Sequence, residues 1–133
     1  MARIDSFLKL VVDQQASDLH FHAGTKPQIR YLGDLISIPF RALSEQETKF
    51  FLSEIMTDGQ RAEFEKEQSV DFAYVVPQVG RFRVNVFHQS RGMGAVFRVI
   101  PDRGASIDRL RLPQAVNDLC NLSAGLVLVT GPT

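Results

Sequence analysis

The first residues of the chain have apolar side chains at helical spacing. Apolar side chains fall there at positions i, i+3, i+4, i+7 and i+8, which predicts an amphipathic helix with one buried face. These residues are Ile4, Phe7, Leu8, Val11 and Val12. A capping-box pattern at Ser44 and Glu47 predicts the start of a second helix, which Asp58-Gly59 should end. Residues 60–68 are strongly polar and predict an exposed helix. Pro113 suits the first position of a last helix that reaches about residue 121.

Alternation of apolar and polar residues predicts short strands between these helices. The predicted strands cover residues 19–22, 28–32, 35–38, 70–76, 81–87 and 95–100. A tight turn at Gly33-Asp34 and a loop holding Gly92 and Gly94 join neighbouring strands into hairpins. Residues 126–129 are continuously apolar, a pattern typical of a buried parallel strand. The order of elements predicts an α+β fold, in which helices pack on an antiparallel sheet and the start of an α/β domain follows.

Composition narrows the classes of function. The chain has 133 residues, is 44% hydrophobic, and balances 15 Lys and Arg against 15 Asp and Glu. The zero net charge gives no reason to expect a nucleic-acid partner. No signal peptide or apolar run of about 20 residues is present, so we expect a cytoplasmic protein without membrane insertion. The single cysteine, Cys120, lies among apolar residues and predicts a buried structural thiol.

The strands at 81–87 and 95–100 carry the strongest candidate chemistry. If the turn between them centres on Ser90-Arg91, Arg83 lies directly opposite Arg98. Like charges placed opposite each other destabilise a sheet, unless carboxylates lie nearby or an anion binds. The planar fork of arginine is well suited to phosphate. The alternative is that these arginines are solvated strand residues with acidic neighbours.

The last residues follow the predicted strand with Gly131-Pro132-Thr133. A buried strand followed by glycine is how a phosphate-binding loop opens, and its full pattern is G-x-x-x-x-G-K-[ST]. The lysine, the Mg²⁺-binding hydroxyl and any catalytic carboxylate are missing from this chain. We therefore expect the chain alone not to hydrolyse ATP.

Four stretches of the chain closely resemble one family. They are Ala16-Ser17-Asp18-Leu19-His20, Gly80-Arg81-Phe82-Arg83-Val84-Asn85, residues 89–101 and residues 125–133. In them the chain resembles the PilT-type twitching-motility ATPases, which belong to the secretion ATPase superfamily of type II secretion and type IV pili. The resemblance covers essentially the whole chain and is most specific in the arginine hairpin and the terminal strand.

The resemblance implies a PAS-like N-terminal domain over residues 1–101, a linker over 102–112 and the start of a RecA-like ATPase domain over 113–133. It implies a homohexamer that binds ATP and Mg²⁺ between its domains and works with inner-membrane pilus base or platform proteins. Arg83 and Arg98, with Arg81 less firmly, match the arginines that reach the phosphates. Gly131, Pro132 and Thr133 match the opening of the phosphate loop.

The branch within the family rests on two further features. Extension and secretion ATPases usually carry an additional N-terminal domain, whereas the PAS-like domain here would start within a few residues of Met1. The segment at residues 88–94 also looks more like the retraction motor than its accessory paralogue. Both features favour pilus retraction, with pilus extension and type II secretion as the alternatives.

Other residues have simpler interpretations. His20 and His22 share a strand face and form a weak zinc hypothesis, since no third ligand is placed by spacing. Asp18 and Asp71 could form an acid/base pair. We expect instead that Asp18 is a turn or capping residue and that Asp71 is a partner for an arginine. Two further functions stay open: a free-standing PAS-like sensor of a small ligand, and an oligomerisation module whose arginines make intersubunit ion pairs.

Overall fold

The structure, a computed structural model, describes residues 2–101, 106–108 and 110–131. The chain divides into two compact units, Met1–Asp102 and Arg103–Thr133, which are described separately below. Pro132 and Thr133 of the expected phosphate loop lie outside the described residues. Within the described residues, no helix has the length and apolar character needed to cross a bilayer.

The first unit is a six-stranded sheet with helices packed on it. The strands are β1 (Asp18–His22), β2 (Gln28–Tyr31), β3 (Asp34–Ser37), β4 (Ser69–Val76), β5 (Gly80–Gln89) and β6 (Gly92–Ile100). They lie in the order β3-β2-β1-β6-β5-β4, and each neighbouring pair is antiparallel. The predicted α+β fold with an antiparallel sheet is therefore confirmed.

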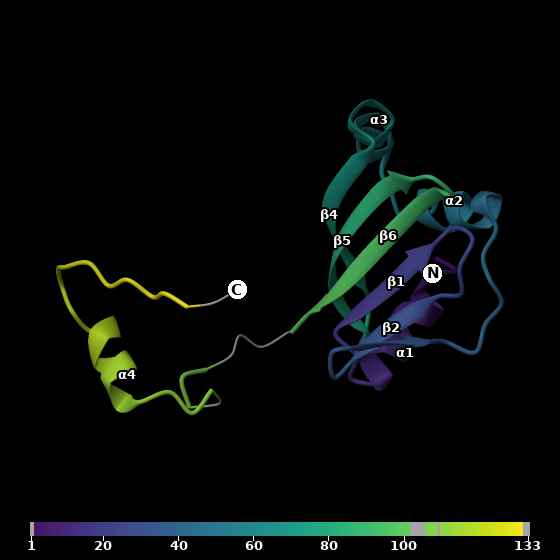
Figure 1. Cartoon of the computed structure of the whole chain (residues 1–133). Helices are drawn as coiled ribbons and strands as arrows, with labels where there is room; N and C mark the ends of the chain where they lie inside the picture. The colour runs from purple at the N-terminus through teal and green to yellow at the C-terminus, as the bar shows by residue number, and fades with distance from the viewer. Residues whose placement is uncertain (1, 102–105, 109, 132–133) are drawn as a thin grey trace. The chain divides into compact units, whose positions relative to one another are not determined.

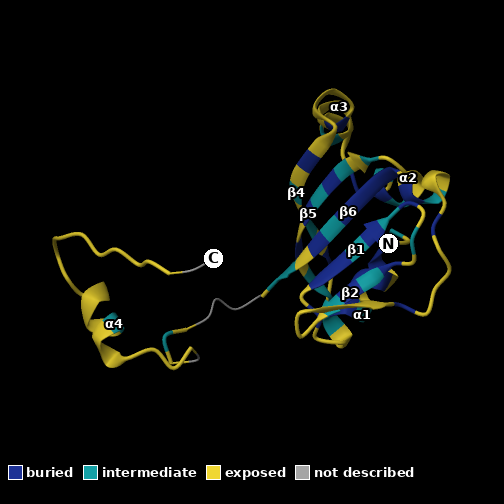
Figure 2. Ribbon diagram, in the orientation of Figure 1, coloured by how far each residue is buried: buried dark blue, intermediate teal, exposed yellow. Residues whose placement is uncertain are grey.

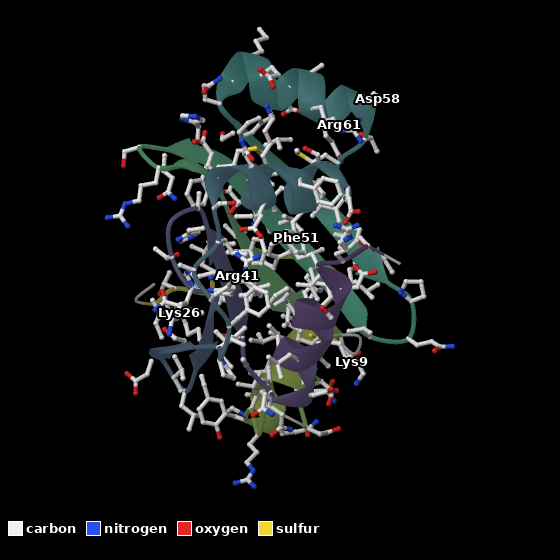
Figure 3. All side chains as sticks on the ribbon, turned by 90° about the vertical axis from the view of Figure 1, so that its right-hand side faces the viewer. Lys9, Lys26, Arg41, Phe51, Asp58 and Arg61 are labelled. Atoms are coloured by element: carbon white, nitrogen blue, oxygen red, sulfur yellow. The ribbon has the colours of Figure 1, made fainter. Side chains whose placement is uncertain are left out.

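One face of the sheet carries the hydrophobic core. The helices α1 (Asp5–Asp13) and α2 (Glu45–Ser53) contact its central strands β1 and β6, and in Figure 1 they lie behind the sheet. In Figure 3, Phe51 lies between the ribbons of α2 and α1, where its ring meets Phe7 and Phe21 edge-on. The alternation of buried and exposed residues along β4 and β5 in Figure 2 reflects the two faces of the sheet. The opposite face is therefore left for polar residues.

The hairpin of β5 and β6 has the register that residue counting predicts. Ser90 and Arg91 form the turn, Gln89 pairs with Gly92, and Arg83 pairs with Arg98. The expected loop containing Gly92 and Gly94 is shorter than predicted, because both glycines belong to β6. Gly92 has φ 109°, a left-handed conformation that favours glycine, and an added Cβ would stand 2.5 Å from Cγ of Glu45.

The boundary between the second and third helices differs from the prediction. The second helix, α2, ends at Ser53, and a further helix, α3, spans Asp58–Glu67. Thr57 caps α3 in a capping box with Gln60, so Asp58 and Gly59 open a helix rather than end one. The polar, exposed character of this segment is as predicted, since Phe64 is its one buried residue.

The second unit contains the helix α4 (Gln114–Cys120), and none of its described residues is buried. No residue of α4 is buried, and Cys120 is exposed, so the prediction of a buried thiol is wrong for this structure. Residues 126–129 form no strand, and their exposed fractions range from 50% to 95% (Figure 2). A parallel strand is buried by neighbouring strands and helices. The described residues of this unit supply no such neighbour, so the predicted buried strand is not formed.

The central strands should carry most of the stability of the first unit. Phe97 of β6 is fully buried, so Phe97→Ala should lower the free energy of unfolding by about 3–5 kcal/mol. Val75→Ala, on the edge strand β4, is the control, because Val75 is 61% exposed and its truncation should cost less than about 1 kcal/mol. Urea unfolding followed by circular dichroism measures both. Equal losses would show that the core is not centred on β6.

Candidate functional site

A row of charged side chains crosses the face of the sheet opposite α1 and α2. Directly paired positions on four neighbouring strands place Arg30 beside Asp18, Asp18 beside Arg98, and Arg98 beside Arg83. Because cross-strand partners in a sheet share a face, all four side chains stand on the same side. We call these four residues the charged row.

The two arginines that sequence analysis predicted are brought together, and each has a carboxylate partner. Nε of Arg98 donates to Oδ1 of Asp18 at 2.9 Å, and Nε of Arg83 donates to Oδ1 of Asp71 at 3.3 Å. Both arginine side chains remain 71% exposed. Among the described residues, neither arginine uses its terminal Nη atoms in a hydrogen bond. Each guanidinium therefore keeps its outer donors free while its Nε is held.

A surface hollow of about 260 Å³ lies between the two arginines. It is lined by Asp71, Arg83, Asn85, Val96 and Arg98. The Asn85 side chain donates to the second oxygen of Asp71 at 2.9 Å, so both oxygens of this carboxylate are engaged. The prediction that Asp71 is an arginine partner is confirmed. The hollow thus presents guanidinium donors on a polar surface, an arrangement that suits a small anion.

Asp18 has a different role from the predicted one. It lies within β1 and is only 3% exposed, so it is neither a turn nor a helix-capping residue. Its carboxylate accepts hydrogen bonds from Arg98 and from the Ser17 hydroxyl at 2.7 Å, and Nε of Arg30 lies 3.6 Å away. Burial by itself raises the pKa of Asp18, but the hydrogen bonds from Ser17 and Arg98 outweigh it and lower the pKa overall. Asp18 is therefore ionised at neutral pH.

The remaining predicted residues lie elsewhere. Arg81 is opposite Ile100, two positions along β5 from Arg83, and lines a separate hollow beside the β4–β5 turn. Gly131 belongs to the second unit and is exposed. The structure therefore joins Arg83 with Arg98, and Arg81 does not line their hollow.

Comparisons with known proteins show what the chain is similar to. No protein-family profile matches the chain. The type IV pilus retraction ATPase PilT of Pseudomonas aeruginosa is 42% identical over 98% of the chain, which spans 38% of that protein. A twitching motility protein of Neisseria gonorrhoeae is 39% identical over 80% of the chain, which spans 29% of its length. A crystal structure of the pilus retraction motor PilT with bound ADP matches 99% of the chain and 39% of that structure, with a TM-score of 0.87 and 34% identity.

The chain is homologous to the N-terminal part of PilT-type ATPases. The Legionella pneumophila ATPase DotB, 22% identical with a TM-score of 0.66 over 86% of the chain, shares the fold. The chain spans less than two fifths of the length of the P. aeruginosa relative. The activity and partners of the longer PilT-type protein are therefore taken up as proposals below.

Sequence reasoning missed the place of two residues, Asp18 and Arg30, in the charged row. A signal for Asp18 was present, because it alternates with His20 and His22 and so belongs to the same strand face. The contribution of Arg30 depends on the antiparallel pairing of β2 with β1, which sets Arg30 opposite Asp18 although the two are twelve positions apart in the sequence (30 − 18 = 12). The missed part of the site therefore depends on the pairing of β1 with β2 and β6, which residue spacing within one strand does not show.

His20 and His22 lie on β1, the strand that Asp18 begins, with their rings close together. Their ring centroids are 5.8 Å apart, and Nε2 of each ring is buried without a hydrogen-bond partner. The described residues contain no group of three or more His, Cys, Asp and Glu side chains able to hold a metal. Gly94 leaves room for the contact between His22 and Phe87, because a Cβ there would meet each ring at 3.1 Å.

The histidine pair should make the stability of the first unit depend on pH. Burial lowers the pKa of both rings, with the charge of Arg30 adding to the effect at His20 and that of His20 at His22. The unfolded chain therefore binds more protons than the folded chain as pH falls below about 6.5, and acid favours unfolding. We expect the free energy of unfolding to fall from pH 7 to pH 5, and to fall less in His20→Asn/His22→Asn.

Urea unfolding at a series of pH values measures this dependence. His88→Gln is the matched control, because it removes the third histidine of the chain from an exposed position at the end of β5 and should keep the wild-type dependence. An unchanged slope in the double variant would show that His20 and His22 do not set the dependence.

Proposed function

We propose that this chain is the N-terminal regulatory and coupling part of a hexameric ATPase that powers type IV pilus retraction. In this proposal Arg83 and Arg98 receive the terminal phosphates of ATP. The single observation that carries it is the pairing of these two arginines on an open sheet face, each held through Nε, with no hydrogen bond from its Nη atoms to another described residue. Similarity to PilT of P. aeruginosa and to a twitching motility protein of N. gonorrhoeae supports retraction as the process.

The chemistry of the pair explains how ATP would be sensed. Two guanidinium groups offer parallel N–H donors to phosphate oxygens, and their charges stabilise the additional charge that the γ-phosphate carries. Contacts to the γ-phosphate favour a closed arrangement of the two proposed domains. Loss of that phosphate after hydrolysis removes the contacts and lets the domains separate. Successive closing and opening around a hexamer would then move the pilus base proteins in the inner membrane and remove pilin from the fibre base.

The sequence identities to two pilus ATPases of one organism support the proposed retraction branch. The chain is 42% identical to PilT and 30% identical to the type IV pilus ATPase PilU of the same organism. The solved PilT structure contains ADP, which supports nucleotide binding in the longer protein. We place Mg²⁺ with the nucleotide and the protein in the cytoplasm at the inner membrane. The PAS-like character of residues 1–101 and the RecA-like start at 113–133 are part of the same proposal.

The small-ligand sensor is less well supported than phosphate binding. Such a sensor needs an apolar pocket with a few convergent polar groups. The hollow at Arg83 and Arg98 has one apolar side chain, Val96, and four charged or polar ones. An oligomerisation module, in which the same Nη donors make intersubunit ion pairs, stays the second candidate, and it differs from phosphate binding in the assembly of the variants tested below.

The proposal predicts the effect of removing either arginine from the longer protein. Arg83→Ala and Arg98→Ala should each lower ATP turnover by about tenfold or more, because each deletes a charged donor to the transferring phosphoryl group. Steady-state ATPase assays measure the loss, and size-exclusion chromatography checks that hexamers persist. Unchanged turnover in both variants would reject the phosphate-contact role. Loss of hexamers with unchanged nucleotide affinity would support the oligomerisation module instead.

The isolated chain should behave differently from the longer protein. Residues 1–133 include no lysine after Gly131 and no complete phosphate loop, so we expect no ATP hydrolysis and at most weak nucleotide binding. Phosphate release and isothermal titration calorimetry test both expectations. ATP binding with a sub-micromolar dissociation constant would contradict them.

A further inference from the structure

We propose that Asp18 is a positioning residue that presents Arg98 to the γ-phosphate. The inference rests on the proposed function, since it assigns a role to a residue behind one of the proposed phosphate-binding arginines. Asp18 does not line the hollow between the arginines. It acts through Arg98, because its Oδ1 accepts a hydrogen bond from Nε of Arg98 at 2.9 Å.

The position of Asp18 gives it little freedom to move. It lies on the central strand β1, with Arg30 on one neighbouring strand and Arg98 on the other. Its side chain is 5% exposed, and the Ser17 hydroxyl fixes the oxygen that Arg98 does not use. Asp71, the partner of Arg83, has a side chain that is 50% exposed and sits on the edge strand β4. Of the two carboxylates, Asp18 is therefore the more buried one, and it lies on a central strand.

Holding Nε has a specific geometric consequence. Arginine is a planar fork, so a hydrogen bond from Nε to a fixed carboxylate restrains the plane of the guanidinium as well as its position. The Nη atoms then point toward an incoming group without a further loss of side-chain entropy on binding. Arg98 is 71% exposed and would otherwise sample many rotamers. Pre-organisation by Asp18 is thus the difference between a solvated arginine and a phosphate receptor.

The balance of charges in the site also supports the positioning role of Asp18. Arg30, Arg98 and Arg83 face Asp18 and Asp71, which leaves the group with one positive charge in excess. Asp18 lies between Arg30 and Arg98 and offsets their charges, while the Arg98–Arg83 pair has no carboxylate between its two paired positions. An anion arriving at the hollow therefore meets Arg98 and Arg83, and the carboxylate that lines the hollow with them is Asp71, not Asp18. Asp18 can hold Arg98 without standing in the path of the phosphate.

The test compares Asp18→Asn with Arg98→Ala in the longer ATPase. For each variant, competition with a fluorescent ADP gives the dissociation constants of ADP and of a non-hydrolysable ATP analogue. Both variants should reduce the preference for the ATP analogue over ADP, by roughly tenfold for Arg98→Ala and several-fold for Asp18→Asn. The double variant should be no worse than Arg98→Ala, because a positioning residue has no effect once its arginine is gone. Independent, additive losses would overturn the proposal.

Two further variants separate positioning from general stability. Asp58→Asn removes an exposed Asp–Arg pair of the same 2.9 Å length on α3 and should leave the ATP preference within about twofold of wild type. Arg98→Lys keeps the charge but has a single ammonium in place of the fork, so it should lose preference as Arg98→Ala does. If Asp18→Asn fails to fold, the preference of Arg98→Lys for the ATP analogue over ADP still tests whether the planar fork is needed. Full preference in Arg98→Lys would show that charge alone suffices and would overturn the role of Asp18.

Failure of this inference can be told apart from failure of the proposed function. If Arg83→Ala and Arg98→Ala both keep the wild-type preference for the ATP analogue, the phosphate-contact role is wrong and the Asp18 role fails with it. If the arginine variants lose the preference and folded Asp18→Asn keeps it, only the positioning role is wrong. Thermal unfolding and chromatography of each variant establish that folded hexamers are compared.

Discussion

The site depends on one constraint: the register of the β5–β6 hairpin sets two arginines directly opposite each other. Arg83 and Arg98 are paired residues on adjacent strands, and their like charges oppose the pairing. The sheet accepts this arrangement because each arginine is held by a carboxylate from the strand on its other side, Asp71 of β4 and Asp18 of β1. The four-strand order β1-β6-β5-β4 is therefore required by the site as well as by the core.

Because successive side chains of β5 and β6 point to opposite faces of the sheet, these strands supply both the core and the site. Phe97 and Val84 face the helices as fully buried core residues, and their sequence neighbours Arg98 and Arg83 face the open side. A shift of one residue in either strand would place an arginine in the core and a hydrophobic residue on the open face. Because burial of the core is worth far more than the repulsion between two exposed arginines, packing fixes the register and the register fixes the site.

Sequence patterns within a few residues of one another predicted the hairpin of β5 and β6, but not the pairings between strands that are distant in the sequence. Counting outward from the turn at Ser90-Arg91 was enough to pair Arg83 with Arg98, since a two-residue turn fixes the register of a hairpin. The role of Asp18 depends on β1 pairing with both β2 and β6, and sequence alone gave no means of seeing those pairings. Residues 126–129 have the composition of a buried strand, yet they are exposed because the strands and helices that would bury them are not among the described residues of their unit.

Exposure of the arginine pair explains why phosphate sensing would be coupled to movement. Charges in water interact weakly, so two guanidinium groups that are each 71% exposed gain little from a phosphate that stays solvated. The same contacts strengthen when a second protein surface covers the hollow and excludes water. The free energy of phosphate recognition then becomes available only as the covering surface closes. Under the proposed function, an open, pre-organised receptor would therefore favour closure when the γ-phosphate is present, which is the property that a motor needs from its nucleotide sensor.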